Sequence, residues 1–537
     1  MQTSQNLQGS STSIQGFYHP PLQDIDSYLS HFHDSGSQGS QLSVQTCNEQ
    51  FFTLDSCPAI AGYAVFDSPA PSVSSNRDSF SPQGSQSYFS DPHQSPENNY
   101  GSPMSFNSVA DNDHELRHGL RKLETFLLGP ESETVGSCNC PFRDGGYQAS
   151  SMTNCSHLVE MIPKLDLKQV LIRCARAISE ADLSSASGLM HVLGQMVSVS
   201  GEPIQRLSAY MLEGLRARLE ASGTSICKKL RCNEPTSSEL MSYMGVLYQV
   251  CPYYKFAYTS SNVLIGDAMA DESRIHIIDF QIAQGSQWVQ FIQALACRPG
   301  GPPFIRVTGV DDSQSTYARG GGLHIVGEKL AQIARSCGVP FEFHASAMSG
   351  CEVQLGNLGV RPGEAIAVNF PYMLHHMPDE SVTTVNHRDR LLRLVKSLSP
   401  KIVTLLEQES KTNTAPFFQR FLETLDYYTA MFESIDVKLP RDDKQRISAE
   451  QHCVARDIVN IIACEGVERV ERHELLGKWR SRLTMAGFCQ CPLSSSVGYA
   501  IKDVLKDYHA NFRLEHREGA LCLHWKHRAM VTCSAWR

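Results

Sequence analysis

The sequence predicts an α/β fold: a methyltransferase-like Rossmann core with a mostly parallel sheet and a C-terminal antiparallel hairpin, joined to an N-terminal helical cap. The first observation is the run from Arg274 to Phe280, which is short, β-branched and nearly all apolar. Such a run is typical of a strand buried on both faces of a parallel sheet. It leads through one Gly-containing turn into a helix from about Ser286 to Ala296. Strand and helix patterns then alternate, and the chain ends in alternating strands.

Length and charge bound the class of protein. At 537 residues, the chain has room for one large domain and a tail, or for two or three domains. The net charge is −9, and residues 1–110 carry −8 of it, from nine acidic residues against Arg77. The body is therefore nearly neutral and has no general attraction for nucleic acid, so phosphate binding would need a local basic face.

Cysteine usage and hydropathy indicate an intracellular protein. The eighteen Cys include no C-x-x-C pair, and most lie in apolar segments, which suits reduced thiols. Cys138/Cys140 and Cys489/Cys491 could each be half of a zinc site, but no matching pair follows at finger-like spacing, so no metal site is predicted. We find no bilayer-spanning apolar stretch and no signal peptide, and we expect no membrane partner.

Residues 1–155 are predicted to be a disordered region rich in Ser and Gln. The first 110 residues hold 24 Ser and 12 Gln without a sustained hydrophobic period, so little apolar burial could offset the entropy of ordering. Thirteen Phe and Tyr are dispersed there among acidic residues. They could dock weakly on a partner, and an inert tail is the alternative. A short helix at 113–128 is either a docking helix or a strap on the main domain.

The body of the chain, 156–537, is expected to begin with a helical cap over 156–272. Apolar residues recur at helical spacing from Leu165 to Ala181. The same period predicts further helices over 183–198, 203–221, 237–250 and 261–271. We interpret their apolar stripes as the core of a bundle, and a dimerisation or partner surface is the alternative.

The α/β core, 273–537, alternates strands with helices, which implies right-handed crossovers and a mostly parallel sheet. After the first strand, further strands are expected at 304–310, 341–344, 365–370 and 402–407. Helices are expected at 323–337, 380–398, 415–433, 449–464 and 471–486. The end should form a hairpin of 512–516 with 520–525, turning at Gly519, and then a strand at 529–534. This ending is the arrangement of S-adenosylmethionine methyltransferases.

The turn after the first strand argues against a bound cofactor. Cofactor loops place several Gly there, so that the backbone can approach the ligand closely. The turn from Gln281 to Gln287 has one Gly, Gly285, and it carries the bulky Ile282 and Gln284. We therefore predict no cofactor. Asp279 should have a structural role, accepting hydrogen bonds from backbone N–H groups at the end of the strand.

No catalytic residue is predicted. His375 and His376 follow the fourth strand and could act as acid or base, but no second catalytic partner can be named. A role in supporting their loop fits them better. The sequence has no G-x-S-x-G nucleophile elbow and no H-E-x-x-H motif.

One charged segment is a candidate for DNA contact. Acids and bases alternate at helical spacing between Glu468 and Arg482, which is typical of a solvated, ion-paired helix. The alternative is a face that contacts the DNA backbone. Its members would be Arg469, Arg472, Lys478, Arg480 and Arg482.

Five ordered motifs resemble those of the GRAS family of plant transcriptional regulators. The VHIID motif is matched by Ile275, His276, Ile277, Ile278 and Asp279, with Gly285 and Trp288 following. The stretches from Leu165 and from Leu323 resemble the two leucine-rich regions. The dispersed PFYRE region is matched by Pro400, Tyr427-Tyr428 and Arg469 to Glu474. The terminal SAW motif is matched by Ser534, Ala535 and Trp536, with Trp525 upstream. The tail from Trp525 to Trp536 should be a sheet strand rather than a peptide signal.

Two N-terminal stretches narrow the resemblance, which covers about 158–537 in the body. Leu116 to Glu124 and Leu127 to Pro130 are similar to the phytochrome-A signalling branch, which includes scarecrow-like and chitin-inducible gibberellin-responsive proteins. The DELLA motif is absent, so direct hormone-dependent degradation is not implied.

The resemblance implies a non-enzymatic transcription regulator or co-regulator in light, hormone or stress signalling. It would be nuclear, with a cytoplasmic pool, and would act through other transcription factors or GRAS proteins, as a homo- or heterodimer. Contact with DNA, direct or indirect, stays open, and no small-molecule substrate is identified. A cytoplasmic signalling scaffold and a methyltransferase with an unusual loop are the alternatives.

Overall fold

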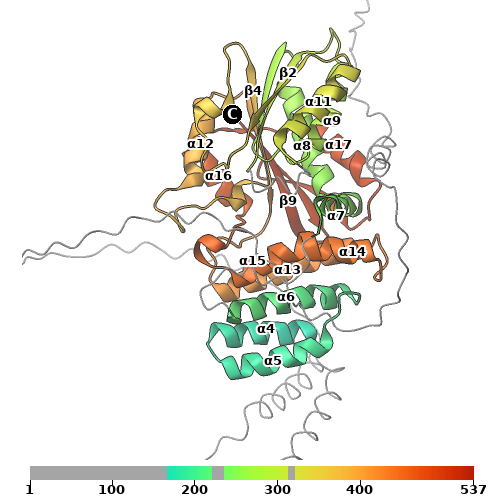
Figure 1. The fold of residues 1–537 in the computed structure, drawn as a ribbon, viewed down its shortest axis with the longest axis vertical. Helices are drawn as coiled ribbons and strands as arrows, with labels where there is room; N and C mark the ends of the chain where they lie inside the picture. Colours follow the sequence, from blue (N-terminus) through green and yellow to red (C-terminus); the bar gives the residue numbers. More distant parts are fainter. Residues whose placement is uncertain (1–165, 221–234, 313–320) are drawn as a thin grey trace, which may run out of the picture. The chain divides into compact units, whose positions relative to one another are not determined.

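The computed structural model describes residues 166–220, 235–312 and 321–537 (Figure 1). All of them belong to one of the two compact units of the chain, and the other unit, Cys57–Ser137, lies outside the described residues. The expectations for residues 1–155, including the helix at 113–128 and the pair Cys138/Cys140, also lie outside them.

A single sheet of nine strands organises the described residues, in the order β3-β2-β1-β4-β5-β9-β8-β7, with β6 paired to β9. The strands are β1 (Arg274–Asp279), β2 (Phe304–Val310), β3 (Phe341–Ser346), β4 (Ala365–Pro371), β5 (Ile402–Gln408), β6 (Gln490–Cys491), β7 (Phe512–Arg517), β8 (Ala520–Trp525) and β9 (Arg528–Trp536). Strands β1 to β5 are parallel, whereas β9, β8 and β7 pair antiparallel. The predicted parallel sheet with an antiparallel hairpin is confirmed.

Strand β1 lies in the interior of this sheet, between β2 and β4. Its residues Ile275, Ile277 and Ile278 are fully buried. A strand with neighbours on both edges and helices on both faces is buried on both sides, which explains its nearly continuous apolar run.

Helices cover both faces of the sheet (Figure 1). On one face lie α12 (His387–Ser397) and α16 (Leu476–Met485), whose apolar side chains share a core cluster with Ile278, Val368 and Trp536. The other face is covered by α8 (Tyr253–Ala268), α9 (Ser286–Ala296), α11 (Leu323–Ser336) and α17 (Ser495–Leu505). No helix in the described ranges is long and apolar enough to cross a membrane.

A separate helical layer combines segments that are far apart in the sequence. The early helices α4 (Leu167–Ser179), α5 (Leu183–Met196) and α6 (Pro203–Glu220) pack with the late helices α13 (Phe417–Asp436) and α15 (Ala455–Ala463). Likewise, α7 (Ser237–Val250) packs with α14 (Lys444–Ala449). The packing therefore does not follow the predicted division at 272/273, because α8 packs on the sheet and α13 to α15 pack on the cap helices.

Buried ion pairs fasten the two parts of this helical layer. The guanidinium of Arg206 on α6 lies 3.1 Å from Glu450 and 2.6 Å from Asp436, and Arg206 is fully buried. Glu450 opens a π-helical turn, Glu450–Val454, between α14 and α15, and it also pairs with Arg446. Removing one partner would leave a buried charge unpaired, so these contacts fix how α6 sits on the later helices.

Several predicted helix boundaries differ from the structure. Helix α8 begins at Tyr253 instead of 261, and its first turns carry aromatic residues that obscured the helical period. Helix α12 begins at His387 instead of 380, and the side chain of Asn386 caps this observed start. The helix predicted over 471–486 begins only at Leu476, because residues 471–475 are not helical.

The C-terminal strand β9 lies inside the sheet, between β5 and β8. It is longer than the predicted 529–534 and includes Trp536, which is 1% exposed. The indole N–H of Trp536 donates to Ser534 Oγ at 2.9 Å. The tail as far as Trp536 is therefore part of the core.

We predict that Trp536→Ala lowers the free energy of unfolding by about 3–5 kcal/mol, because a buried aromatic ring is lost from a packed core. Urea denaturation of the full chain measures this. The control is Tyr499→Ala, since Tyr499 is 70% exposed and its loss should change stability by no more than about 0.5 kcal/mol. A Trp536→Ala effect as small as that of the control would contradict the placement of the tail.

Candidate functional site at the carboxyl edge of the sheet

The carboxyl ends of β1 and β4 form the topological switch point of this sheet. The chain leaves β1 for β2 on one side, whereas β4 lies on the other side of β1. Open α/β sheets bind ligands in the crevice at such a point. Here the point is marked by Asp279 at the end of β1 and Asn369 near the end of β4, which are register partners.

The Asp279 carboxylate is 1% exposed and surrounded by donors. It accepts hydrogen bonds from the backbone N–H of Gln281 at 3.0 Å, the indole N–H of Trp288 at 2.7 Å and Asn369 Nδ2 at 3.4 Å. The expected bond to a backbone N–H is therefore present. Burial raises the pKa of Asp279 to about 6, although the three hydrogen bonds oppose that rise.

Asn369 extends this network to helix α8. Its Oδ1 accepts hydrogen bonds from the hydroxyls of Ser261 at 2.7 Å and Thr404 at 2.8 Å. Its Nδ2 donates to Gln287 Oε1 at 3.1 Å, and Gln287 Nε2 in turn donates to Asn262 Oδ1 at 3.1 Å. Side chains from β1, β4, β5, α8 and α9 thus satisfy one another across the switch point.

The turn after β1 packs into the same place. Ile282 is 4% exposed and lies against β2, where a β-carbon on Gly309 would come within 2.9 Å of its Cδ1. Gly285 caps α9 with a φ of +69°, and a β-carbon there would lie 2.8 Å from Val326. The single Gly of the turn therefore serves helix packing, and Ile282, Trp288 and Asn369 are buried side by side with the strand ends at the switch point.

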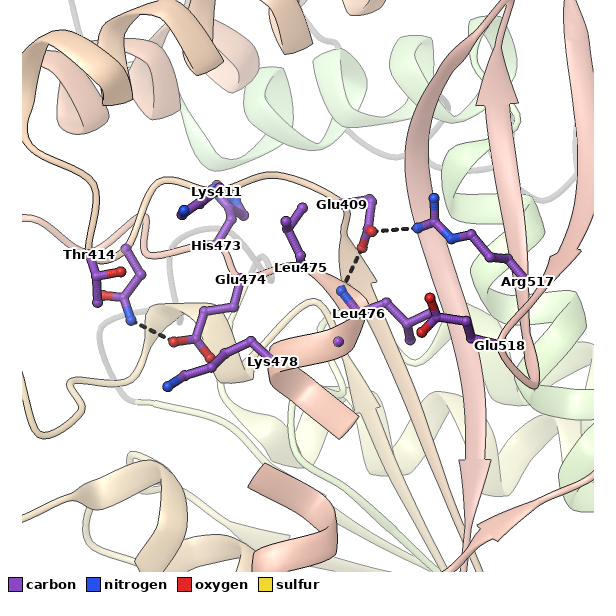
Figure 2. Close-up of a pocket in the computed structure, with 12 residues that line it drawn as sticks. Glu409, Lys411, Thr414, His473, Glu474, Leu475, Leu476, Lys478, Arg517 and Glu518 are labelled. Atoms are coloured by element: carbon purple, nitrogen blue, oxygen red, sulfur yellow. Dashed lines mark hydrogen bonds and ion pairs between the residues drawn. The ribbon is translucent and has the colours of Figure 1, made fainter. Parts of the chain in front are cut away.

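A cavity of about 430 Å³ opens farther along the same edge, beyond the end of β5 (Figure 2). Glu409 holds one wall: its carboxylate lies 2.5 Å from the Arg517 guanidinium and accepts the Leu476 N–H, in the first turn of α16, at 2.8 Å. The cavity is lined by both acidic and basic residues. They are Glu409, Lys411, Asn413, Thr414, His473, Glu474, Leu475, Leu476, Gly477, Lys478, Arg517 and Glu518.

Three of the five arginines and lysines proposed for DNA contact are buried. Arg469 donates to the backbone carbonyls of Thr412 and Asn413, the latter at 2.8 Å. Arg472 donates to Asn413 Oδ1 at 3.1 Å. The prediction of a solvated helix was wrong for residues 469–474, because this segment runs beside residues 412–413, where Arg469 donates to two backbone carbonyls and Arg472 donates to the Asn413 side chain.

The other members of the predicted face lie on α16. Arg482 is 1% exposed and pairs with Asp379 and Glu474 at 2.9 Å and 2.7 Å. Lys478 is exposed, and Arg480 is half-buried beside Glu518 at 2.9 Å. The five residues do not form one exposed basic surface.

His375 supports the loop that follows β4, which is the role that we expected for it in preference to acid–base catalysis. Its Nδ1 lies 2.5 Å from Glu407 Oε2, and Glu407 Oε1 accepts the Leu374 and His375 N–H groups. Burial lowers the pKa of His375, but the carboxylates of Glu407 and Glu471 outweigh that effect and raise it to about 10. Glu407, Glu471 and His473 were not found from the sequence. Glu407 could have been found, because it ends the predicted strand 402–407, which pairs with β4.

Comparison with known proteins gives consistent matches over most of the chain. The GRAS domain family matches residues 167–537. Scarecrow-like protein 13 of Arabidopsis thaliana is 61% identical over 91% of this chain and 92% of that protein. Scarecrow-like transcription factor PAT1 of Arabidopsis thaliana is 60% identical over 80% of this chain and 88% of its own length. Chitin-inducible gibberellin-responsive protein 2 of Oryza sativa subsp. japonica is 53% identical over 94% of this chain and 90% of its own length.

A solved structure is similar as well. The crystal structure of SCL7 in Oryza sativa superposes with a TM-score of 0.62 at 34% sequence identity. The match covers 69% of this chain and 99% of that one.

We predict that Asp279 and Trp288 are energetically coupled. Asp279→Ala should cost about 1–3 kcal/mol for each buried donor it leaves without an acceptor. In the Asp279→Ala/Trp288→Phe double variant the indole donor is gone as well, so the combined cost should be smaller than the sum by about 0.5–3 kcal/mol. Urea denaturation of the four proteins measures the difference. The control cycle pairs Asp279→Ala with Tyr499→Ala, an exposed residue outside the hydrogen-bond network, and should be additive. Additivity in both cycles would refute the buried hydrogen bond.

Proposed function

The chain belongs to the GRAS domain family of plant regulators of signalling and transcription, and we propose that it regulates transcription through protein contacts and not through catalysis. We further propose that it works in the nucleus, with a cytoplasmic pool, in light, hormone or stress signalling. Two relatives are named for such roles, one as a transcription factor and one as chitin-inducible and gibberellin-responsive.

The filled switch point is the observation that supports a non-enzymatic role most strongly. To bind its cofactor, a methyltransferase of this fold would need open space and an accessible backbone at the carboxyl ends of β1 and β4. In this chain the buried side chains of Trp288, Ile282 and Asn369 lie there, and the polar groups of Trp288 and Asn369 are already hydrogen-bonded to protein partners. A ligand would have to displace buried side chains and break several of these bonds.

Access to DNA is proposed to come mainly through partner transcription factors or GRAS proteins. Burial of Arg469, Arg472 and Arg482 leaves Lys478 and Arg480 from the predicted basic face, and Arg480 is already paired with Glu518. Two side chains give little of the phosphate neutralisation on which non-specific DNA affinity depends. Homo- or heterodimers would provide further contacts. A cytoplasmic scaffold is the second candidate, which the reporter experiment below separates from this one.

We predict that S-adenosylmethionine gives no saturable heat when titrated calorimetrically into the full chain, because the crevice is filled. A methyltransferase titrated under the same conditions is the control. Stoichiometric binding that Asp279→Ala abolishes would contradict the proposal and favour an enzyme.

We also predict that the full chain, fused to a foreign DNA-binding module, activates a reporter in plant cells through its N-terminal aromatics. Replacing the thirteen Phe and Tyr of residues 1–110 with Ser should abolish activation, because the dispersed rings supply the apolar contacts with the partner. Replacing the same number of Ser with Ala is the control. Activation that survives loss of the rings would refute their role, and a wild-type fusion that never activates would favour the cytoplasmic scaffold.

A further inference from the structure

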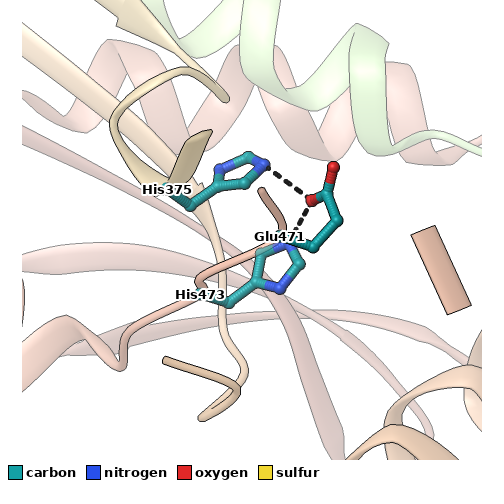
Figure 3. A group of neighbouring side chains, drawn as sticks. All are labelled: His375, Glu471 and His473. Carbon is teal, nitrogen blue, oxygen red and sulfur yellow. Dashed lines mark ion pairs between the residues drawn. The ribbon is translucent and has the colours of Figure 1, made fainter. Parts of the chain in front are cut away.

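Three buried side chains converge on one point behind the cavity wall (Figure 3). His375 Nε2 and His473 Nε2 each lie 3.4 Å from Glu471 Oε2. His375 lies in the short helix η6 (Leu374–His376) that follows β4, whereas Glu471 and His473 lie in the extended segment before α16. Within the described residues, this is the one group of His, Cys, Asp or Glu whose ligand atoms gather as a metal site requires, all within 4.8 Å. Cys489 and Cys491 are not part of it.

Both imidazole rings are held by their other nitrogen. His375 Nδ1 bonds to Glu407 at 2.5 Å, and His473 Nδ1 bonds to the Thr412 hydroxyl at 2.9 Å. Metal-binding histidines are held in this way, since a partner on one nitrogen orients the ring and aims the other nitrogen at the ion.

The protein alone leaves one of these nitrogens unsatisfied. His473 is 1% exposed, and its Nε2 has no hydrogen-bond partner although it faces Glu471. Protonated His375 between Glu407 and Glu471 forms a complete ion-pair network by itself. That network explains the position of His375 but leaves the buried Nε2 of His473 without a hydrogen bond, which costs free energy.

We propose that His375, His473 and Glu471 bind a divalent first-row transition metal ion, for which Zn²⁺ fits the spacing. Zinc binds His nitrogen and carboxylate oxygen at about 2.0–2.2 Å, so two ligand atoms of a tetrahedral ion lie about 3.4 Å apart. Both Nε2–Oε2 distances have this value. The ion takes the place of the proton between His375 and Glu471, which is released. Two histidines and one carboxylate leave a fourth position for water.

A metal ion at this position would also link two parts of the fold, which goes beyond the proposed function. It ties the end of β4 to the segment that leads into α16, and His473 also lines the cavity of about 430 Å³. Metal binding would therefore stiffen one wall of that cavity.

The test uses the full chain, stripped of metal with a chelator and titrated with ZnCl₂ against a chromophoric competitor. We expect one tightly bound Zn²⁺ per chain. His473→Gln and Glu471→Gln should each lower the affinity by more than the roughly 10–100-fold that loss of an outer partner costs, and Thr412→Val should fall within that range. The control is His324→Gln, an exposed histidine on α11, which should leave the affinity unchanged.

Co²⁺ in place of Zn²⁺ identifies the ligands in the unmodified chain, so the test survives a variant that fails to fold. Visible bands of a low-coordinate Co²⁺ site without a thiolate charge-transfer band support the proposal. A thiolate band at the first equivalent assigns the ion to the cysteines and overturns it. Zinc uptake that is equal in wild type and a folded His473→Gln variant overturns it as well.

Discussion

The carboxylate of Asp279 lies at the end of an interior strand, out of contact with water, and it stays there because three donors surround it. An ionised group without such partners would cost far more free energy than a domain can spare. Each donor brings an element with it. Trp288 fixes the first turn of α9, Gln281 fixes the turn after β1, and Asn369 links β4 to α8 through Ser261. The arrangement of five elements around the switch point follows from satisfying one buried acid.

The same rule applies along the rest of the carboxyl edge. Glu407 at the end of β5 is paired with His375, and Arg482 on α16 joins Asp379 and Glu474. Removing one member of such a buried network leaves the other charges unpaired in the interior. Separating the elements at this edge of the sheet is therefore costly in free energy. In the function that we propose, this methyltransferase-like core is a rigid support for protein contacts.

The parts of this fold that were predictable are those governed by local pattern. The apolar run of β1, the alternation of strands and helices and the hairpin at Gly519 each have a period that requires no tertiary information. The prediction of a solvated helix over Arg469 to Glu474 was wrong. A sequence of alternating charges is the same whether solvent or neighbouring protein groups satisfy those charges. The spacing of its arginines carried no sign of the Thr412 and Asn413 oxygens to which they donate. The sequence did single out His375 as a candidate residue. It could not show that Glu471 and His473 lie beside it, because their positions depend on the non-helical path of residues 469–474.

The central claim is that the switch point is a packed interior and not an open cofactor site. Amide hydrogen exchange of residues 280–288 and 369–376 in the full chain, with and without S-adenosylmethionine, tests it most directly. The account predicts slow exchange, close to that of the sheet strands and unchanged by the cofactor, since opening these amides would expose buried polar groups. Fast exchange in both segments that slows when the cofactor is added would contradict it.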